Sequence, residues 1–202
     1  GVFMDTVAKG DALESKTFAL LQQELNEGRL GIIPSSGRIF HKKGYYSKDR
    51  EKDIVVDISI EVWPPNAENY SLLWVCECKN YGHSVPVDDV EEFKAKLDQI
   101  AGKNVKGVIA TRNSFQSGAV SYAKNQGIGL VRVMPDDQVS WYMHCIVSNS
   151  PLTPKRLNPR EFNAALTNER YQAQERSFYS SYDGYIFGNW QSLVKHALSE
   201  NS

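Results

Sequence analysis

The feature that most constrains the fold is a change of hydrophobic period after Gly82. Apolar residues then recur at helical spacing from Val87 to about Gly102. The next three segments read as a short apolar strand, a helix and a second apolar strand, at residues 107–111, 114–125 and 128–134. Two strands joined through a helix by short links form a right-handed parallel crossover. This part of the chain therefore predicts a parallel sheet covered by helices.

The segments before Gly82 predict one helix followed by antiparallel strands. Apolar positions at helical spacing mark residues 12–26, and short strands are expected at 32–34 and 38–41 around a Ser-Ser-Gly turn. Residues 53–62 alternate in polarity, residues 71–79 are rich in large apolar side chains, and a short polar link suggests that they pair as a hairpin. The expected class is α/β, a mixed sheet flanked by helices in the order α-β-β-β-α-β-α-β.

The pattern becomes less regular beyond Pro135. We therefore divide the chain into a core at 1–135 and a mainly helical C-terminal appendage at 136–202, with helices expected at 159–172 and 191–199. Large aromatic residues gather in this appendage, and we expect them to cover the core rather than bind a ligand. They are Phe178, Tyr179, Tyr182, Tyr185, Phe187 and Trp190.

Composition indicates a folded chain and excludes several classes. Hydrophobic residues make up 41% of the 202 residues and charged residues 23%, as in ordinary globular domains. No apolar run reaches the roughly 18 residues of a membrane helix, and no secretory signal opens the sequence, so we expect no membrane partner. Three cysteines, two of them one residue apart, exclude a disulfide scaffold and favour the reducing cytoplasm. Because the chain begins with Gly, a longer protein with further domains stays open.

The net charge of −1 gives no global sign of a nucleic-acid binder, but one segment is cationic. Between Arg38 and Lys52 there are six cations and two anions, with aromatic residues among them. Such a stretch fits a phosphate backbone, and equally a solvated loop. The DNA-contacting candidates are Arg38, Lys42, Lys43, Lys48 and Arg50, together with Ser114, whose position at a helix start could bind a phosphate or simply cap the helix.

Charged residues inside apolar strands are the strongest chemical signal. Glu77 and Lys79 share one face of the strand at 71–79, and Asp57 interrupts the preceding strand. A lone Glu-x-Lys is usually a strand end or an ion pair. Two carboxylates that converge from neighbouring strands, however, suit a hard divalent cation, and a nearby lysine could orient water or stabilise phosphate charge.

These residues resemble a known family. Asp57, followed after twenty residues by Glu77-Cys78-Lys79, resembles the PD-(D/E)xK nuclease signature in the branch of Mrr-like restriction endonucleases. The resemblance covers roughly residues 10–134 and includes Gly107-Val-Ile-Ala-Thr111 and Gly127-Ile128. The sequence departs from the signature in having Val56 rather than Pro before the aspartate.

The resemblance implies a restriction-endonuclease-like core that hydrolyses DNA phosphodiester bonds with Mg²⁺, Mn²⁺ being a substitute. It implies that Asp57 and Glu77 are metal ligands, that the carbonyl of Cys78 is a third, and that Lys79 is the catalytic lysine. Glu14 resembles an accessory ligand on the first helix, and a solvated helix position is the equal alternative. Because cutting both strands usually needs two sites, a homodimer is also expected.

Two rival interpretations stay open. The chain could be an inactive nucleic-acid-binding or protein-interaction module that retains the nuclease fold, or a structural domain in which Glu77 and Lys79 only pair at a strand end. The complete Asp-Glu-Lys set argues against the first. Metal binding near Asp57 and Glu77 separates the nuclease from the second.

Overall fold

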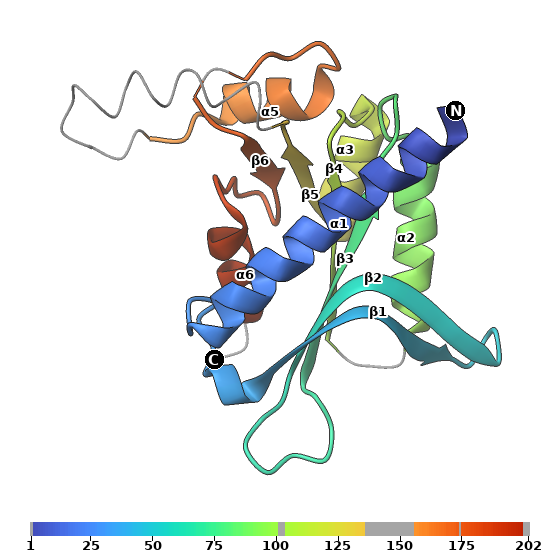
Figure 1. The fold of residues 1–202 in the computed structure, drawn as a ribbon, viewed down its shortest axis with the longest axis vertical. Helices are drawn as coiled ribbons and strands as arrows, with labels where there is room; N and C mark the ends of the chain where they lie inside the picture. The colour runs from blue at the N-terminus through green and yellow to red at the C-terminus, as the bar shows by residue number, and fades with distance from the viewer. Residues whose placement is uncertain (1, 101–103, 136–155, 174, 200–202) are drawn as a thin grey trace.

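The computed structural model describes residues 2–100, 104–135, 156–173 and 175–199, with side chains from residue 12 onward. Six strands form one sheet in the order β1-β2-β3-β4-β5-β6 (Figure 1). The strands are β1 (Gly37–Ser47), β2 (Lys52–Val62), β3 (Leu72–Lys79), β4 (Val105–Thr111), β5 (Gly129–Val133) and β6 (Phe178–Ser181). Neighbours from β1 to β3 are antiparallel, β3, β4 and β5 are parallel, and β6 is antiparallel to β5.

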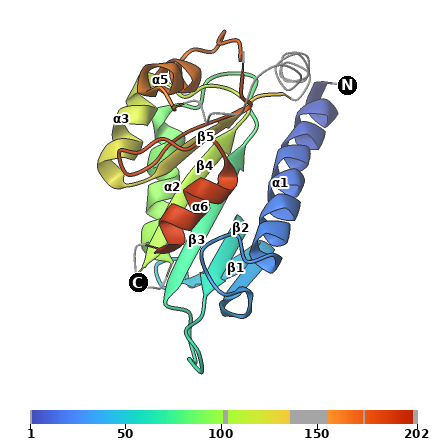
Figure 2. The same ribbon diagram turned by 90° about the vertical axis from the view of Figure 1, so that its left-hand side faces the viewer.

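Helices cover both faces of the sheet, as Figures 1 and 2 show. One core cluster joins the sheet to α2 (Val87–Gln99), α3 (Ser117–Gln126) and α5 (Pro159–Thr167). The other joins the opposite face to α1 (Val2–Asn26) and α6 (Trp190–Ser199). A short 3-10 helix, η1 (Pro34–Ser36), precedes β1. Apolar residues on both faces of β3 are buried, because a central strand in a three-layer fold has no solvent face.

The parallel half of the sheet confirms the predicted crossover. Links through α2 and α3 connect β3 to β4 and β4 to β5. Gly127 ends α3 with φ 67°, a left-handed conformation that glycine adopts without a steric penalty. At Gly107 a side chain would meet the ring of Phe93 at 2.7 Å, so the glycine lets α2 pack closely on β4. The expected α/β mixed sheet and its order of elements are confirmed.

The structure corrects several local predictions. No strand forms at Ile32 and Ile33, and the expected strand at 38–41 is the start of the longer β1. The helix predicted from residue 12 already runs from Val2, and the one predicted for 159–172 ends at Thr167. The missed strand β6 makes the C-terminal residues part of the same sheet.

The predicted aromatic packing is confirmed for most of the C-terminal cluster. Phe178, Tyr179, Tyr182 and Trp190 are buried, whereas Tyr185 is 61% exposed. The division at residue 135 stays a prediction. No described helix has the length and apolar character needed to cross a membrane.

Candidate active site

The site begins at a break in the pairing of β1 with β2. The register pairs Gly37 with Val62 and Ser47 with Lys52 but skips Lys42 and Asp57, and Lys42 has φ 57°. At the break the side chains of β2 switch from one face of the sheet to the other. Val56 packs in the cluster under α2, whereas Ile58, two residues later, packs under α1. In a regular strand these two side chains would share a face. Such irregularities re-aim side chains and are over-represented beside active sites.

Asp57 lies where β2 separates from β3. The pairing of β2 with β3 runs from Val62 back to Ile58, which pairs with Cys76. Asp57, the residue that precedes Ile58 in the sequence, is therefore not paired with β3. Its Oδ2 accepts a hydrogen bond from the backbone N–H of Cys78 at 2.8 Å, and its Oδ1 lies 2.9 Å from Nζ of Lys42. The carboxylate is therefore fixed against the Glu-Cys-Lys segment and directly contacts the residue whose carbonyl was the expected third ligand.

Glu14, on α1, contacts the same lysine as Asp57. It is only 5% exposed, which rules out a solvated helix position. Its Oε2 lies 2.9 Å from Nζ of Lys42, and its Oε1 contacts Nε2 of His41, whose ring stacks on Phe18. Lys42 thus bridges Glu14 and Asp57. Burial acts to lower the pKa of Lys42, but its hydrogen bonds to the two carboxylates outweigh this and raise that pKa above its usual value.

Glu77 and Lys79 extend from the end of β3 toward α2. Nζ of Lys79 lies 3.5 Å from Oε1 of Glu77, and Lys96 of α2 donates to the same oxygen at 3.0 Å. The other oxygen, Oε2, is buried and has no hydrogen-bond partner among the described residues. A buried carboxylate oxygen without a hydrogen-bond partner is costly, so Oε2 is a natural position for a bound cation or a water.

Lys79 is positively charged at neutral pH. Burial acts to lower the pKa of Lys79, but the acidic groups around it raise this pKa above its usual value. The carboxylate of Glu77 contributes most, followed by the phenol of Tyr81 and the carboxylates of Asp89 and Glu92. With a raised pKa, Lys79 offers a positive charge and N–H donors rather than a basic nitrogen.

The carboxylates have the chemistry of ligands for a hard divalent ion. Mg²⁺ is usually bound through one or two carboxylates and several waters, which Asp57 and the free oxygen of Glu77 could supply. Over the part of the chain that is described, no three His, Cys, Asp or Glu side chains cluster closely enough to hold a metal. The ammonium of Lys42 lies where Glu14 and Asp57 would otherwise share a cation.

The predicted DNA-contacting residues divide into three groups. Lys42 and Lys43 are paired with acids, Lys43 with the buried Glu61 at 2.5 Å, so neither is a freely available phosphate contact. Arg38 stacks over the ring of Trp63 at 4.0 Å, and Arg50 donates to Gln99 at 3.0 Å. Lys48 lies on the surface.

Ser114 is placed differently from the other DNA-contacting candidates. It is fully buried, and its hydroxyl hydrogen-bonds to Ser84 at 2.5 Å. The structure also starts α3 at Ser117, so Ser114 does not cap it. A phosphate cannot reach this hydroxyl in the structure described, and we leave Ser114 out of the DNA-contacting set.

Sequence reasoning missed two cations of the site. The first is Lys96, which no motif indicates. Its position one residue before the buried Leu97 is the available signal, since it puts Lys96 near the face of α2 that packs on the sheet. Lys42 was assigned to DNA rather than to the acids. Only the unpaired position in β1 and its positive φ reveal that role, and no local sequence pattern encodes them.

Comparisons with known proteins identify a family for part of the chain. Residues 36–134 match a protein-family model described as "Restriction endonuclease", the Mrr-type catalytic domain. None of the curated proteins compared matches the chain.

Two solved structures were also compared. A protein of unknown function is 15% identical over 70% of this chain and 74% of its own, with a TM-score of 0.38. A repair endonuclease from Pyrococcus abyssi is 17% identical over 57% of this chain and 46% of its own, with a TM-score of 0.35.

The mixed sheet is that of a restriction-endonuclease-like fold, and Asp57, Glu77 and Lys79 match the signature of the PD-(D/E)xK superfamily. Within that superfamily, residues 36–134 belong to the Mrr-like restriction endonuclease branch. The matched region runs from η1 to the residue after β5 and contains these three motif residues.

Proposed function

We propose that the protein is a divalent-metal-dependent DNA endonuclease whose hydrolytic site contains Asp57, Glu77 and Lys79. The observation that carries the proposal is the contact of Asp57 with the backbone of Cys78 where β2 and β3 separate. This contact joins the two halves of the motif in space. The buried oxygen of Glu77 that has no described hydrogen-bond partner gives further support, because it is available to a cation.

In this proposal Asp57 and Glu77 hold Mg²⁺ or Mn²⁺, with the carbonyl of Cys78 and with Glu14 as further ligands. The ion would offset the negative charge that develops on the phosphate during hydrolysis. Lys79, held as a cation by the surrounding carboxylates, stabilises that charge and orients the attacking water. Lys96 fixes the carboxylate of Glu77 through its hydrogen bond. Lys48, Arg50 and Arg38 contact the DNA backbone.

The test is cleavage of supercoiled plasmid in magnesium, manganese or chelator by the full chain and by Lys79→Ala. Lys124→Ala is the matched control, because Lys124 is exposed on α3 near the end of the sheet where β5 begins. We expect nicking or linearisation by the unmodified protein and the control, none by Lys79→Ala, and none with chelator. Cleavage that survives Lys79→Ala or chelation would overturn the proposal.

One observation favours the rival function of an inactive binding module. The bridge from Lys42 to Glu14 and Asp57 satisfies two of the carboxylates without a metal. If the protein binds DNA but neither cleaves it nor binds manganese, that module becomes the better assignment.

A cytoplasmic location, action as a homodimer and the presence of further domains belong to the same proposal. Its support is the nuclease family of residues 36–134 and the usual need for two sites to cut a duplex.

A further inference from the structure

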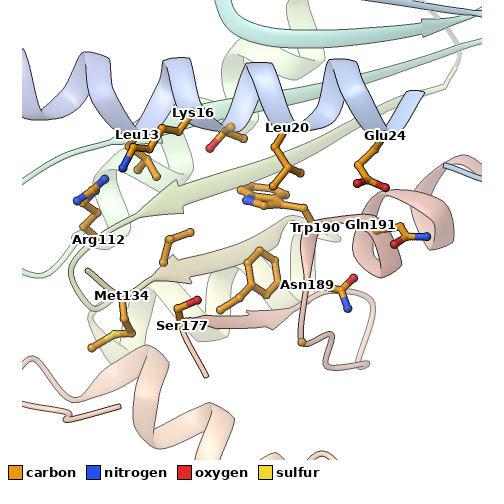
Figure 3. Close-up of a pocket in the computed structure, with 14 residues that line it drawn as sticks. Leu13, Lys16, Leu20, Glu24, Arg112, Met134, Ser177, Asn189, Trp190 and Gln191 are labelled. Carbon is orange, nitrogen blue, oxygen red and sulfur yellow. The ribbon is translucent and has the colours of Figure 1, made fainter. Parts of the chain in front are cut away.

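A cavity of about 500 Å³ lies on the α1 face of the sheet, apart from the motif residues. Figure 3 shows it between α1, the ends of β4 and β5, and the loop that leads into α6. This volume is within the roughly 300–1,000 Å³ of small-molecule sites. None of Asp57, Glu77 and Lys79 lines it, so the cavity is a second candidate site.

One end of the cavity is cationic, with Arg112 and Lys16 beside each other in Figure 3. Arg112 directly follows Thr111, which is the register partner of Lys79, so this end of the cavity neighbours the motif strand. Nε of Arg112 is buried without a hydrogen-bond partner, and the guanidinium has no ion pair with any described residue. A guanidinium whose buried Nε has no partner among the described residues suits an anionic ligand, and its planar donors match the oxygens of a phosphate.

The middle of the cavity is apolar and partly aromatic. Trp190 and Phe178 line it, and their rings are fixed by edge-on contacts with each other and, for Trp190, with Trp74. Leu20 on α1 faces Trp190 across the space in Figure 3 and is 42% exposed, although it is a large apolar residue. A flat apolar group between Leu20 and Trp190 would remove this surface from water.

The far end of the cavity carries amides. Asn189 and Gln191 lie there, away from Arg112 (Figure 3). Oδ1 of Asn189 caps the first turn of α6 by accepting from the N–H of Ser192, so its amide NH₂ remains to donate. Glu24 also lines this end, but its carboxylate is occupied by Arg29 at 2.7 and 2.8 Å.

We propose that this cavity binds one nucleoside phosphate unit. The phosphate lies at Arg112 and Lys16, the base packs between Leu20 and Trp190, and the amides of Asn189 and Gln191 contact the edge of the base. The anion site suits the phosphate, the apolar slot suits the faces of the base, and the amides suit the polar edge of the base, with the sugar between the phosphate and the base. The unit is either a free nucleotide or one nucleotide of a strand, and the second case rests on the proposed nuclease function.

The experiment measures binding by calorimetry with the full chain in chelator, so that no cleavage occurs. The probes are the four deoxynucleoside monophosphates, inorganic phosphate, a short single-stranded oligonucleotide and the same oligonucleotide without bases. Binding of a monophosphate identifies a free nucleotide. Binding of the intact oligonucleotide alone identifies a nucleotide within a strand. Either result supports the proposed chemistry.

Two variants test the assigned contacts. Arg112→Gln removes the charge, and Leu20→Asp places a carboxylate in the apolar slot at a half-exposed position that a folded chain tolerates. We expect each to weaken binding at least tenfold. Arg160→Gln, an exposed arginine on α5, and Ile33→Asp, a 67% exposed apolar residue, are matched controls and leave binding unchanged. Circular dichroism checks that all four variants fold.

Three results would overturn the proposal. They are no binding of any base-containing probe at millimolar concentration, equal binding of inorganic phosphate or of the base-free strand, and binding that Leu20→Asp leaves intact. Lys79→Ala separates this proposal from the nuclease function, because it should keep full binding in the cavity while losing cleavage. Loss of cleavage alone therefore says nothing against the cavity.

Discussion

Replacement of Lys42 by methionine tests whether this lysine holds the place of a metal ion. The ammonium of Lys42 contacts one oxygen of Glu14 and one of Asp57, each at 2.9 Å. A divalent ion that binds these carboxylates must displace the ammonium or bind beside it against its repulsion. Methionine keeps much of the apolar stem of the side chain and removes the charge. We therefore expect Lys42→Met to bind manganese more tightly than the unmodified protein.

The size of the effect follows from the exposure of the pair. The side chain of Lys42 is 50% exposed, so each contact is that of a partly solvated ion pair, about 0.5–1 kcal/mol. Loss of both contacts removes about 1–2 kcal/mol from the free energy that a metal ion needs to displace the ammonium. A change of about 1.4 kcal/mol corresponds to a tenfold change in Kd. The expected gain is thus roughly tenfold in manganese affinity.

The assay is calorimetric titration of the full chain with manganese. Lys48→Met serves as the control, because Lys48 lies on the surface one residue past the end of β1 and has no ion pair with any described residue. It should leave the manganese Kd unchanged. Adding Glu14→Gln to Lys42→Met should reverse much of the gain if Glu14 is a ligand. A Kd that is unchanged or weaker in Lys42→Met would refute the idea that the lysine occupies the cation position.

Three further predictions concern stability and DNA binding. Arg132 is 4% exposed and donates to the carbonyls of Ala165 at 2.7 Å and Asn168 at 2.8 Å. Arg132→Leu should lower the free energy of unfolding by about 3 kcal/mol, because both carbonyl oxygens lose their hydrogen-bond donor. This loss corresponds to a fall of about 6–12 °C in Tm, measured by calorimetry, and a fall under 2 °C would show that Arg132 does not hold α5 to the sheet. Gly107→Ala should lower the free energy of unfolding in urea by about 1–3 kcal/mol, because the new methyl group meets Leu97 and Phe93, and an unchanged value would mean that α2 shifts freely. Joint reversal of charge at Lys48 and Arg50 should weaken DNA binding measured by anisotropy and make its salt slope shallower by about one per lost phosphate contact, whereas an unchanged slope would remove both residues from the DNA surface.

The sequence by itself determined the order of the elements from residue 53 to residue 134. Periods of two and of 3.6 are local properties, and each predicted segment of this region from 53–62 to 128–134 has its counterpart in β2 to β5. The charged residues that interrupt apolar strands can also be recognised from the sequence, because a buried charge is exceptional wherever it occurs. That is why the amino-acid sequence alone singles out Asp57, Glu77 and Lys79, although their catalytic role stays a proposal.

Only the tertiary structure decided which partner each charged or polar side chain meets. The cation-rich segment predicted to lie on DNA is largely strand β1, and the break at Lys42 turns that lysine toward Glu14 and Asp57. Ser114 looked like a helix cap and is instead buried against Ser84. These outcomes depend on contacts between residues about 15 to 30 positions apart, which no local pattern can encode. The cavity at Arg112 arises for the same reason, since α1, the strand ends and α6 meet only in the folded chain.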